Sequence, residues 1–127
     1  GGRGTGIVRF VLLGKNTLIE TSVFTRQIIE LLDDDEYQAL QTELMINPAK
    51  GDLIKEGGGI RKVRCAAKGK GKSGGIRVIY YWLCEDGQIL MLLAYPKSAQ
   101  DNLTDQQTTA LRNLVKDLSH HGSHLIR

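Results

Sequence analysis

The spacing of apolar residues changes near residue 60 of this chain, which separates a helical half from a strand-rich half. Before that point, apolar side chains recur at helical spacing in two stretches, residues 24–32 and 37–45. Residues 33–35 are aspartates that can cap the second helix, and Asn47-Pro48 ends it because the residue before a proline avoids helical conformation. A weakly alternating stretch, residues 17–22, predicts a first strand.

From Ile60 onward the hydrophobic period is two, which predicts three strands at about residues 60–66, 76–83 and 89–95. Asp86-Gly87 is typical of a tight hairpin turn between the last two strands. The third strand reads ILMLLAY and is apolar at consecutive positions, which indicates that both of its faces are buried. We therefore expect it to be the most central strand.

A last helix is predicted after Thr104, which is a favourable N-cap with Gln107 at the capping-box position. Its apolar stripe consists of Leu111, Leu114, Val115 and Leu118. Together the elements predict a small α+β domain, in which helices cover one face of a mainly antiparallel sheet. The N-terminal helices pack on that face, and a C-terminal helix completes the fold.

The expected boundaries place the domain at residues 16–118. Residues 1–15 open with GGRGTG and no initiator methionine, so we expect them to be a non-native or disordered extension. Residues 119–127 are expected to form a flexible tail. The tail carries an H-H-x-x-H pattern at His120, His121 and His124, which could bind a metal. Because the pattern lies in a terminal tail, we expect any such binding to be incidental.

Length and composition limit the class of protein. A chain of 127 residues forms one domain with a modest core, and 41% hydrophobic with 24% charged residues is ordinary for a globular protein. No apolar run approaches the roughly 18 residues that a transmembrane helix needs, so we expect a cytoplasmic protein without membrane partners. Cys65 and Cys84 lack the spacing of metal ligands, which favours two buried thiols. A disulfide between them is the alternative.

Charge is distributed unevenly, although the net charge is only +3. No acidic residue lies between Glu56 and Glu85, and this gap holds a dense group of cations. The cations are Arg61, Lys62, Arg64, Lys68, Lys70, Lys72 and Arg77. Like charges on a short segment repel one another, which makes sense if a nucleic-acid backbone supplies the negative charge. The alternative is a solvated basic loop between two strands.

The glycine-rich arm does not predict nucleotide hydrolysis. Residues 66–73 match a relaxed phosphate-loop pattern, but that motif requires a helix to follow, and GGIRVIYYW is typical of a strand. We interpret the arm as flexible, with glycine spacers that let Lys68, Lys70 and Lys72 follow RNA phosphates. Arg61 is assigned to the same RNA-binding group.

Strand alternation predicts a more rigid patch beside the arm. Lys62 and Arg64 fall on one face of their strand, while Val63 and Cys65 fall on the other, which suits the core. Arg77 opens the next strand, so three cations can converge on one patch of sheet. Cleavage of RNA at a 2′-hydroxyl needs a base, positive charge at the phosphate and a proton for the leaving oxygen.

Because histidines occur only in the tail, such chemistry would depend on lysine, arginine and tyrosine. Tyr80, Tyr81 and Trp82 resemble base-stacking platforms, but each is better explained as a core residue. Tyr95 ends the apolar strand beside Lys97 and is the better candidate for a functional aromatic side chain.

The string GGIRKVRCAAKGKGKSGGIRVIYYW, followed by an apolar strand that ends in Ala-Tyr-Pro-Lys and by an amphipathic helix, resembles the HigB branch of the RelE-type bacterial toxins. The upstream segment NPAKGDLI fits the same branch. The resemblance implies an endoribonuclease that cleaves mRNA on the ribosome without metal or cofactor. It also implies a cognate antitoxin, often with a helix-turn-helix domain.

Carried over by position, the resemblance assigns Lys62 as general base and Arg64 and Arg77 as phosphate-stabilising residues. RelE has an arginine and a tyrosine where this chain has Ser98 and Thr104, so the general acid stays open among Tyr95, Lys97 and a lysine of the arm. Two other functions stay open as well. One is a non-catalytic RNA- or ribosome-binding module, and the other is a basic surface that docks an acidic protein.

Overall fold

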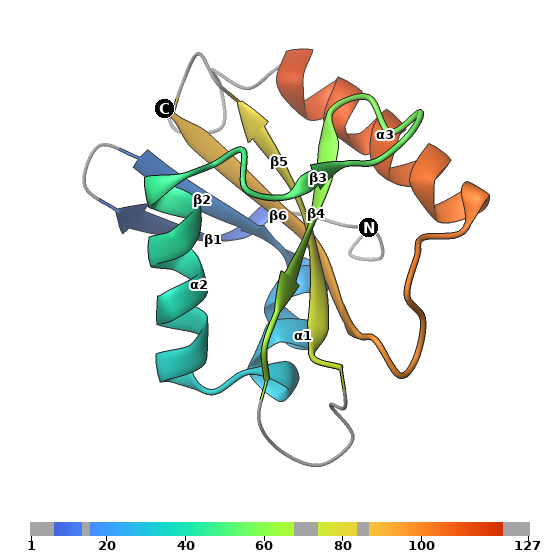
Figure 1. Ribbon diagram of the computed structural model, residues 1–127. Coiled ribbons are helices and arrows are strands. Elements are labelled where there is room, and N and C mark those ends of the chain that lie inside the picture. The colour runs from blue at the N-terminus through green and yellow to red at the C-terminus, as the bar shows by residue number, and fades with distance from the viewer. Residues whose placement is uncertain (1–6, 14–15, 68–73, 84–86, 121–127) are drawn as a thin grey trace.

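The computed structural model describes residues 7–13, 16–67, 74–83 and 87–120 (Figure 1). It contains three helices and six strands in this part of the chain. The strands are β1 (Ile7–Leu13), β2 (Asn16–Thr21), β3 (Asp52–Leu53), β4 (Ile60–Cys65), β5 (Ile76–Leu83) and β6 (Gln88–Pro96). The helices are α1 (Ser22–Leu31), α2 (Asp34–Ile46) and α3 (Asp105–His120).

The strands form one sheet in the order β1-β2-β6-β5-β4-β3. All neighbours are antiparallel except β2 and β6, whose parallel pairing brings the N-terminal hairpin beside the last strand. The prediction that the stretch ILMLLAY is central is confirmed, because β6 lies between β2 and β5 and most of its residues are buried. The expected α+β class with a mainly antiparallel sheet is also confirmed.

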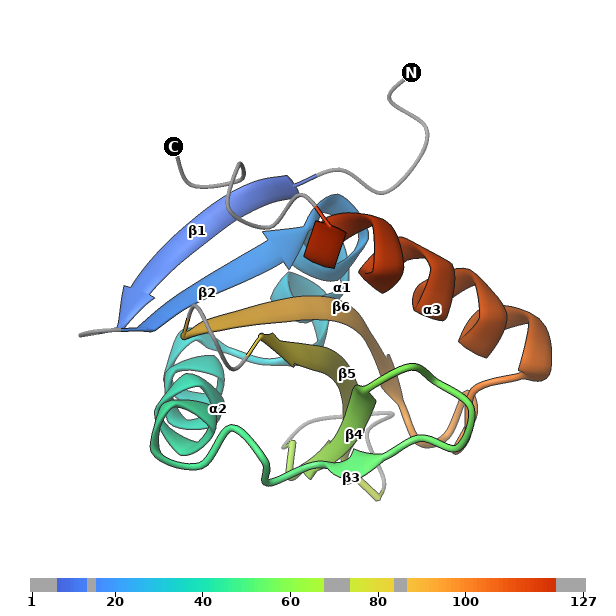
Figure 2. The same cartoon turned by 90° about the horizontal axis from the view of Figure 1, so that it is seen from above.

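The sheet is covered on both faces (Figure 2). Helices α1 and α2 pack on one face through Phe24, Ile28, Leu40 and Leu44. Helix α3 packs on the other face, where Val115 joins the core with the partly buried Leu111 and Leu114. The expectation that all helices cover one face is therefore wrong for α3. The physical reason is that β5 and β6 carry apolar side chains on both faces, so each face of the sheet has to be shielded from water by a helix.

Local sequence signals account for the helix ends. Thr21 caps α1, and its Oγ1 accepts a hydrogen bond from the Phe24 N–H. Asp33 and Glu36 form a reciprocal capping box at the start of α2, and Thr104 and Gln107 do the same before α3. The predicted caps at residues 33–35 and at Thr104 are thus confirmed.

The N-terminal boundary differs from the prediction. Within residues 1–15, which were expected to be a non-native or disordered extension, Ile7–Leu13 are ordered as the edge strand β1 and pair with β2. Val11 packs against the core, although it lies outside the expected domain. At the other end, α3 continues to His120, so the first two residues of the expected tail are helical.

Candidate functional site

Three of the predicted site residues form a row across the sheet. Arg64 on β4 lies opposite Arg77 on β5, and Arg77 lies opposite Tyr95 on β6. Directly opposed residues in antiparallel strands point to the same face, with Cβ atoms about 5 Å apart. Lys62 lies two positions along β4 on that face, opposite Ile79. The sheet therefore brings together the three cations that strand alternation predicted, and it adds Tyr95.

A β-bulge puts Tyr95 on this face. Tyr80 pairs with Met91 and Ile79 pairs with Leu93, so Leu92 is an extra residue on β6. Met91 packs in the core under α1 and α2, and strict alternation would turn Tyr95 toward that same core. The extra residue reverses the alternation, and Tyr95 packs on the α3 side instead.

Two side chains, the N-cap Thr21 and Gln27 in the middle of α1, satisfy the backbone groups around the bulge. The Thr21 hydroxyl donates to the carbonyl oxygen of Leu92 at 3.1 Å. The side-chain Oε1 of Gln27 accepts from the Ala94 N–H at 2.8 Å. Because unpaired buried backbone groups are costly, these two contacts stabilise the bulge and hence the position of Tyr95.

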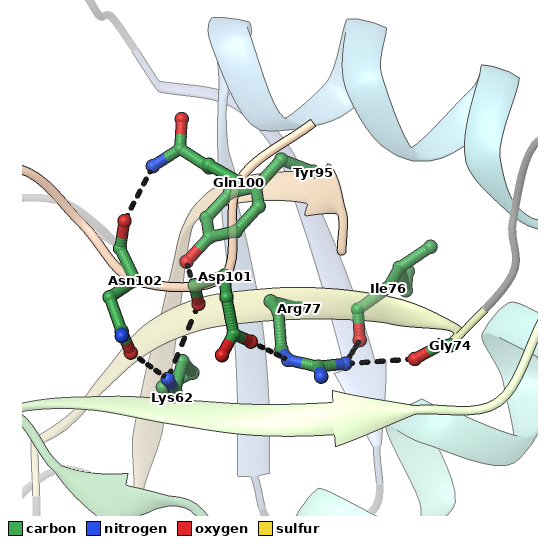
Figure 3. A network of polar contacts seen from close by, with 8 residues as sticks. All are labelled: Lys62, Gly74, Ile76, Arg77, Tyr95, Gln100, Asp101 and Asn102. Atoms are coloured by element: carbon green, nitrogen blue, oxygen red, sulfur yellow. Dashed lines mark hydrogen bonds and ion pairs between the residues drawn. The ribbon is translucent and has the colours of Figure 1, made fainter. Parts of the chain in front are cut away.

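The turn between β6 and α3 lies over the row (Figure 3). The Lys62 ammonium donates to Asn102 Oδ1 at 2.7 Å and to the Asp101 carbonyl oxygen at 3.3 Å. The Tyr95 hydroxyl donates to the same carbonyl oxygen at 3.3 Å. Two consecutive turn residues thus contact side chains from two different strands.

Arg77 is almost completely covered, with only 4% of the residue exposed. Its Nε donates to Asp101 Oδ1 at 3.2 Å, and a terminal nitrogen donates to the carbonyl oxygens of Gly74 at 3.1 Å and Ile76 at 3.3 Å (Figure 3). A buried guanidinium needs such partners because removing its charge from water is expensive. In this conformation Nε and one terminal nitrogen of Arg77 therefore bind the protein itself.

Hydrogen bonds within the turn define its shape. The Pro96 carbonyl oxygen accepts from the N–H groups of Ala99 and Gln100. The Gln100 side chain donates to the Asn102 carbonyl oxygen at 3.0 Å and to Gln107 Oε1 at 2.9 Å. The turn is thereby tied to the capped start of α3, next to the candidate site.

Arg64 and Lys97 are the exposed members of the predicted catalytic set. The Arg64 side chain makes no hydrogen bond or ion pair with the described residues and points to solvent beside the row. Lys97 is also exposed, and its aliphatic part passes over Gly74, where an added Cβ would lie 2.8 Å from the Lys97 Cδ. Two exposed cationic side chains thus lie near the covered Arg77, one across from it on β4 and one over Gly74.

The electrostatic environment of Tyr95 favours its neutral form. Burial raises the pKa of the phenol, the Asp101 carboxylate adds to this increase, and Arg77 opposes it. Tyr95 therefore keeps its proton at neutral pH, as a proton donor must.

Arg61 lies on the opposite face of β4 from Lys62. Its guanidinium donates to the carbonyl oxygens of Ala49 at 3.2 Å and Gly51 at 2.8 Å, which anchors the segment before β3. Arg61 is therefore not brought to the candidate site. The lysines of the arm, Lys68, Lys70 and Lys72, lie outside the described residues.

The aromatic residues of β5 belong to the core or its margin. Tyr80 is fully buried, and its hydroxyl donates to the Pro48 carbonyl oxygen and accepts from the Gly51 N–H. Tyr81 and Trp82 are half-buried and pack against the two core clusters. The core interpretation of these residues is confirmed.

Asp101 and Asn102 are functional candidates that the sequence did not reveal. An acidic residue in a polar segment before a helix cap is unremarkable in sequence, and only the fold brings it to Arg77, 24 residues away along the chain. The tail histidines His121 and His124 lie outside the described residues. In the described ranges, no helix combines the length and apolar character required to cross a bilayer.

A protein-family model matches most of the chain. The family model of the RelE toxin of the RelE / RelB toxin-antitoxin system matches residues 19–126. The match covers all the candidate site residues and every element except β1 and the first residues of β2.

Proposed function

The chain belongs to the RelE toxin family, and from this premise we propose that it is a ribosome-dependent mRNA endoribonuclease of the HigB type. Family membership makes it the toxin component of a toxin-antitoxin system, which is paired with an antitoxin. The finer proposal adds the ribosome and translated mRNA as targets and a helix-turn-helix antitoxin as the partner. The observation that carries it is the row of Arg64, Arg77 and Tyr95 with Lys62 beside it.

The proposed reaction is a transesterification that needs no metal. The 2′-oxygen of the RNA attacks the adjacent phosphorus, and the bond from phosphorus to the 5′-oxygen breaks. One fragment then ends in a 2′,3′-cyclic phosphate and the other begins with a 5′-hydroxyl. A base takes the proton of the 2′-hydroxyl, cations stabilise the phosphate charge, and an acid protonates the leaving oxygen.

Each role has a candidate in or near the row. Lys62 is proposed as the base, Arg64 as the exposed cation at the phosphate, and Tyr95 or Lys97 as the acid. Tyr95 lies opposite Arg77 and is protonated at neutral pH, so it can donate a proton, and its raised pKa makes it a weaker acid than an exposed tyrosine. Arg77 is proposed to stabilise the phosphate charge as well. Its guanidinium is covered and bound to Asp101, so it lies deeper in the site than Arg64.

Binding to the ribosome is proposed for the arm rather than for the row. Lys68, Lys70 and Lys72 follow Arg64 in the sequence and add positive charge to this part of the chain, which suits phosphates of mRNA or ribosomal RNA. Arg61 lies on the opposite face of β4 and is not proposed to contact the RNA segment that is cleaved.

Alanine variants of the row test the nuclease. We expect Lys62→Ala and Arg64→Ala each to lower mRNA cleavage by about 100-fold and to relieve growth arrest, because each removes one group that acts in the transition state. The measurement is 5′-end mapping of mRNA after toxin induction. Lys50→Ala is a matched control, since it removes one exposed positive charge on the α2 side of the sheet.

The same mapping separates the nuclease from a non-catalytic RNA- or ribosome-binding module. Such a module would stop growth without new 5′ ends, and its binding would still weaken with salt. Full toxicity and unchanged cleavage in both alanine variants would show that the site is assigned incorrectly. Arg77→Ala is less informative alone, because losing a buried guanidinium leaves Asp101 and two carbonyl oxygens without their donor.

A further inference from the structure

The Asp101 carboxylate occupies the position on Arg77 where an anion would bind. Its Oδ1 lies 3.2 Å from the Arg77 Nε, and the Arg77 side chain is only 5% exposed whereas that of Asp101 is 49% exposed. Solvent, or RNA, therefore meets the carboxylate before it meets the guanidinium. A phosphate that approaches Arg77 from the open side would face a negative charge.

The same turn engages other groups that the proposed reaction needs. Lys62 donates to Asp101 and Asn102, and the Tyr95 hydroxyl donates to the Asp101 carbonyl oxygen. Arg64 alone among the strand residues of the site has no such contact with the described residues. The turn thus competes for the base, for the buried cation and for the phenol at once (Figure 3).

We propose that Asp101 is an internal competitor of the RNA phosphate, so that the turn of residues 97–104 inhibits the site until RNA displaces it. This inference rests on the proposed function, since it concerns the regulation of the same site. The hydrogen bonds of Asp101 and Asn102 are made to side chains that a substrate would also engage. Withdrawal of the turn would free Arg77 Nε and Lys62 Nζ together.

The chemistry of the contact supports exchange with a phosphate. A carboxylate and a phosphate both accept from guanidinium nitrogens, and the phosphate offers more acceptor oxygens. Asp101 is half-exposed, so an RNA backbone with several charges can reach its side of the ion pair and replace the carboxylate as the partner of Arg77. The contact between Gln100 and Gln107 involves neither Arg77 nor Lys62, so it does not have to break when Asp101 leaves Arg77.

The test measures binding without cleavage. The probe is a short single-stranded RNA with 2′-O-methyl groups, which cannot undergo 2′-oxygen attack, and the readout is fluorescence anisotropy with the full chain at several salt concentrations. Asp101→Asn removes the charge but keeps an oxygen acceptor for Arg77. We expect this variant to bind the probe about three- to fivefold more tightly than the unmodified protein.

Salt dependence gives a second expected result. With Arg77 freed for one more phosphate contact, the slope of log affinity against log salt should steepen by about 0.7. Asp105→Asn is the matched control, because it removes an equal charge in the first turn of α3 without a contact to Arg77 or Lys62 among the described residues. Equal or weaker binding by Asp101→Asn relative to Asp105→Asn overturns the inference, and so does an absence of binding by Asp101→Asn.

A length-matched pair guards against misfolding. Asp101→Glu keeps the negative charge and Asp101→Gln removes it, and thermal unfolding reports whether each variant is folded. We expect only Asp101→Gln to gain affinity, and equal affinity of the two would overturn the inference. The outcome is independent of the nuclease: absent mRNA cleavage would refute the proposed function, while a gain by Asp101→Asn would still identify Asp101 as the competitor.

Discussion

At the scale of single residues, exposure distinguishes the cations of the site, although they look alike in the sequence. Arg64 is exposed, Lys62 is partly buried and Arg77 is almost completely covered. The difference follows from position on the sheet, since β5 lies inside and β4 near the edge. A buried guanidinium must be hydrogen-bonded, and this explains why Arg77 binds carbonyl oxygens and Asp101. Three side chains of equal charge therefore differ in how easily an RNA phosphate can contact them.

Cys65 shows the same effect of environment on a neutral group. The structure describes it as a free thiol that is partly buried, while Cys84 lies outside the described residues. Burial raises the pKa of Cys65 from 9.0 to about 11, the carboxylates of Glu43 and Glu36 add to this, and Lys50 opposes it. The thiol is thus kept protonated at neutral pH.

We predict that Cys65 reacts slowly with iodoacetamide. At pH 8 its thiolate fraction should be on the order of 100-fold lower than that of a thiol with the pKa of 9.0, because only the thiolate reacts. Between pH 8 and pH 10 the rate should keep rising about tenfold for each pH unit, since this range lies below the folded pKa. Mass spectrometry of a Cys84→Ser variant measures the rate of alkylation of Cys65, and a rate that levels off near pH 9 would contradict the prediction.

At the scale of elements, the bulge of β6 depends on side chains of α1 and its N-cap. Leu92 interrupts the pairing with β5, and α1 supplies Thr21 and Gln27 to its free backbone groups. The helix therefore does more than cover the sheet, because it stabilises the backbone change that turns Tyr95 toward Arg77. A residue far from the site in sequence, Gln27, thereby supports the geometry of the site.

We predict that Gln27→Leu destabilises the protein by about 1–3 kcal/mol, since it leaves the Ala94 N–H without its acceptor. Urea unfolding measures the loss, and Gln38→Leu on the exposed side of α2 is the control. If both variants are equally stable, the contact with Ala94 does not support the bulge. A fall in mRNA cleavage beyond the loss of folded protein would further show that Tyr95 has moved.

At the scale of the whole molecule, β1 extends the domain beyond the part that matches the RelE family. The match begins at residue 19, yet Ile7–Leu13 pair with β2 and place Val11 against the core under α1 and α2. This strand lies at the edge of the sheet opposite to β3 and β4. Its contribution is therefore to stability and edge protection rather than to the site.

We predict that removal of residues 1–13 lowers the free energy of unfolding by at least about 2 kcal/mol, because the backbone pairing of β2 and the packing of Val11 are lost. The truncated chain should also aggregate more readily, since the edge of β2 becomes free. Removal of residues 1–6, which ends before β1, is the control. Equal unfolding curves for the two truncations would show that β1 is dispensable.

The sequence by itself determined the elements, because caps and hydrophobic periods act over a few residues. The aspartates before α2, the capping box of Thr104 and the apolar stretch of β6 each specify local structure that the fold confirms. It also determined the face of Lys62 and Arg64, since both lie on one regular strand. Alternation along that strand is a local property.

Only the tertiary structure decided which of these residues meet and which are covered. The position of Tyr95 depends on an extra residue in β6, and a one-residue change reverses every later side chain along a strand. The contacts of Asp101 and Asn102 depend on packing between segments 24 to 40 residues apart. Such contacts follow from the sheet order and the path of the last turn, neither of which any local pattern encodes.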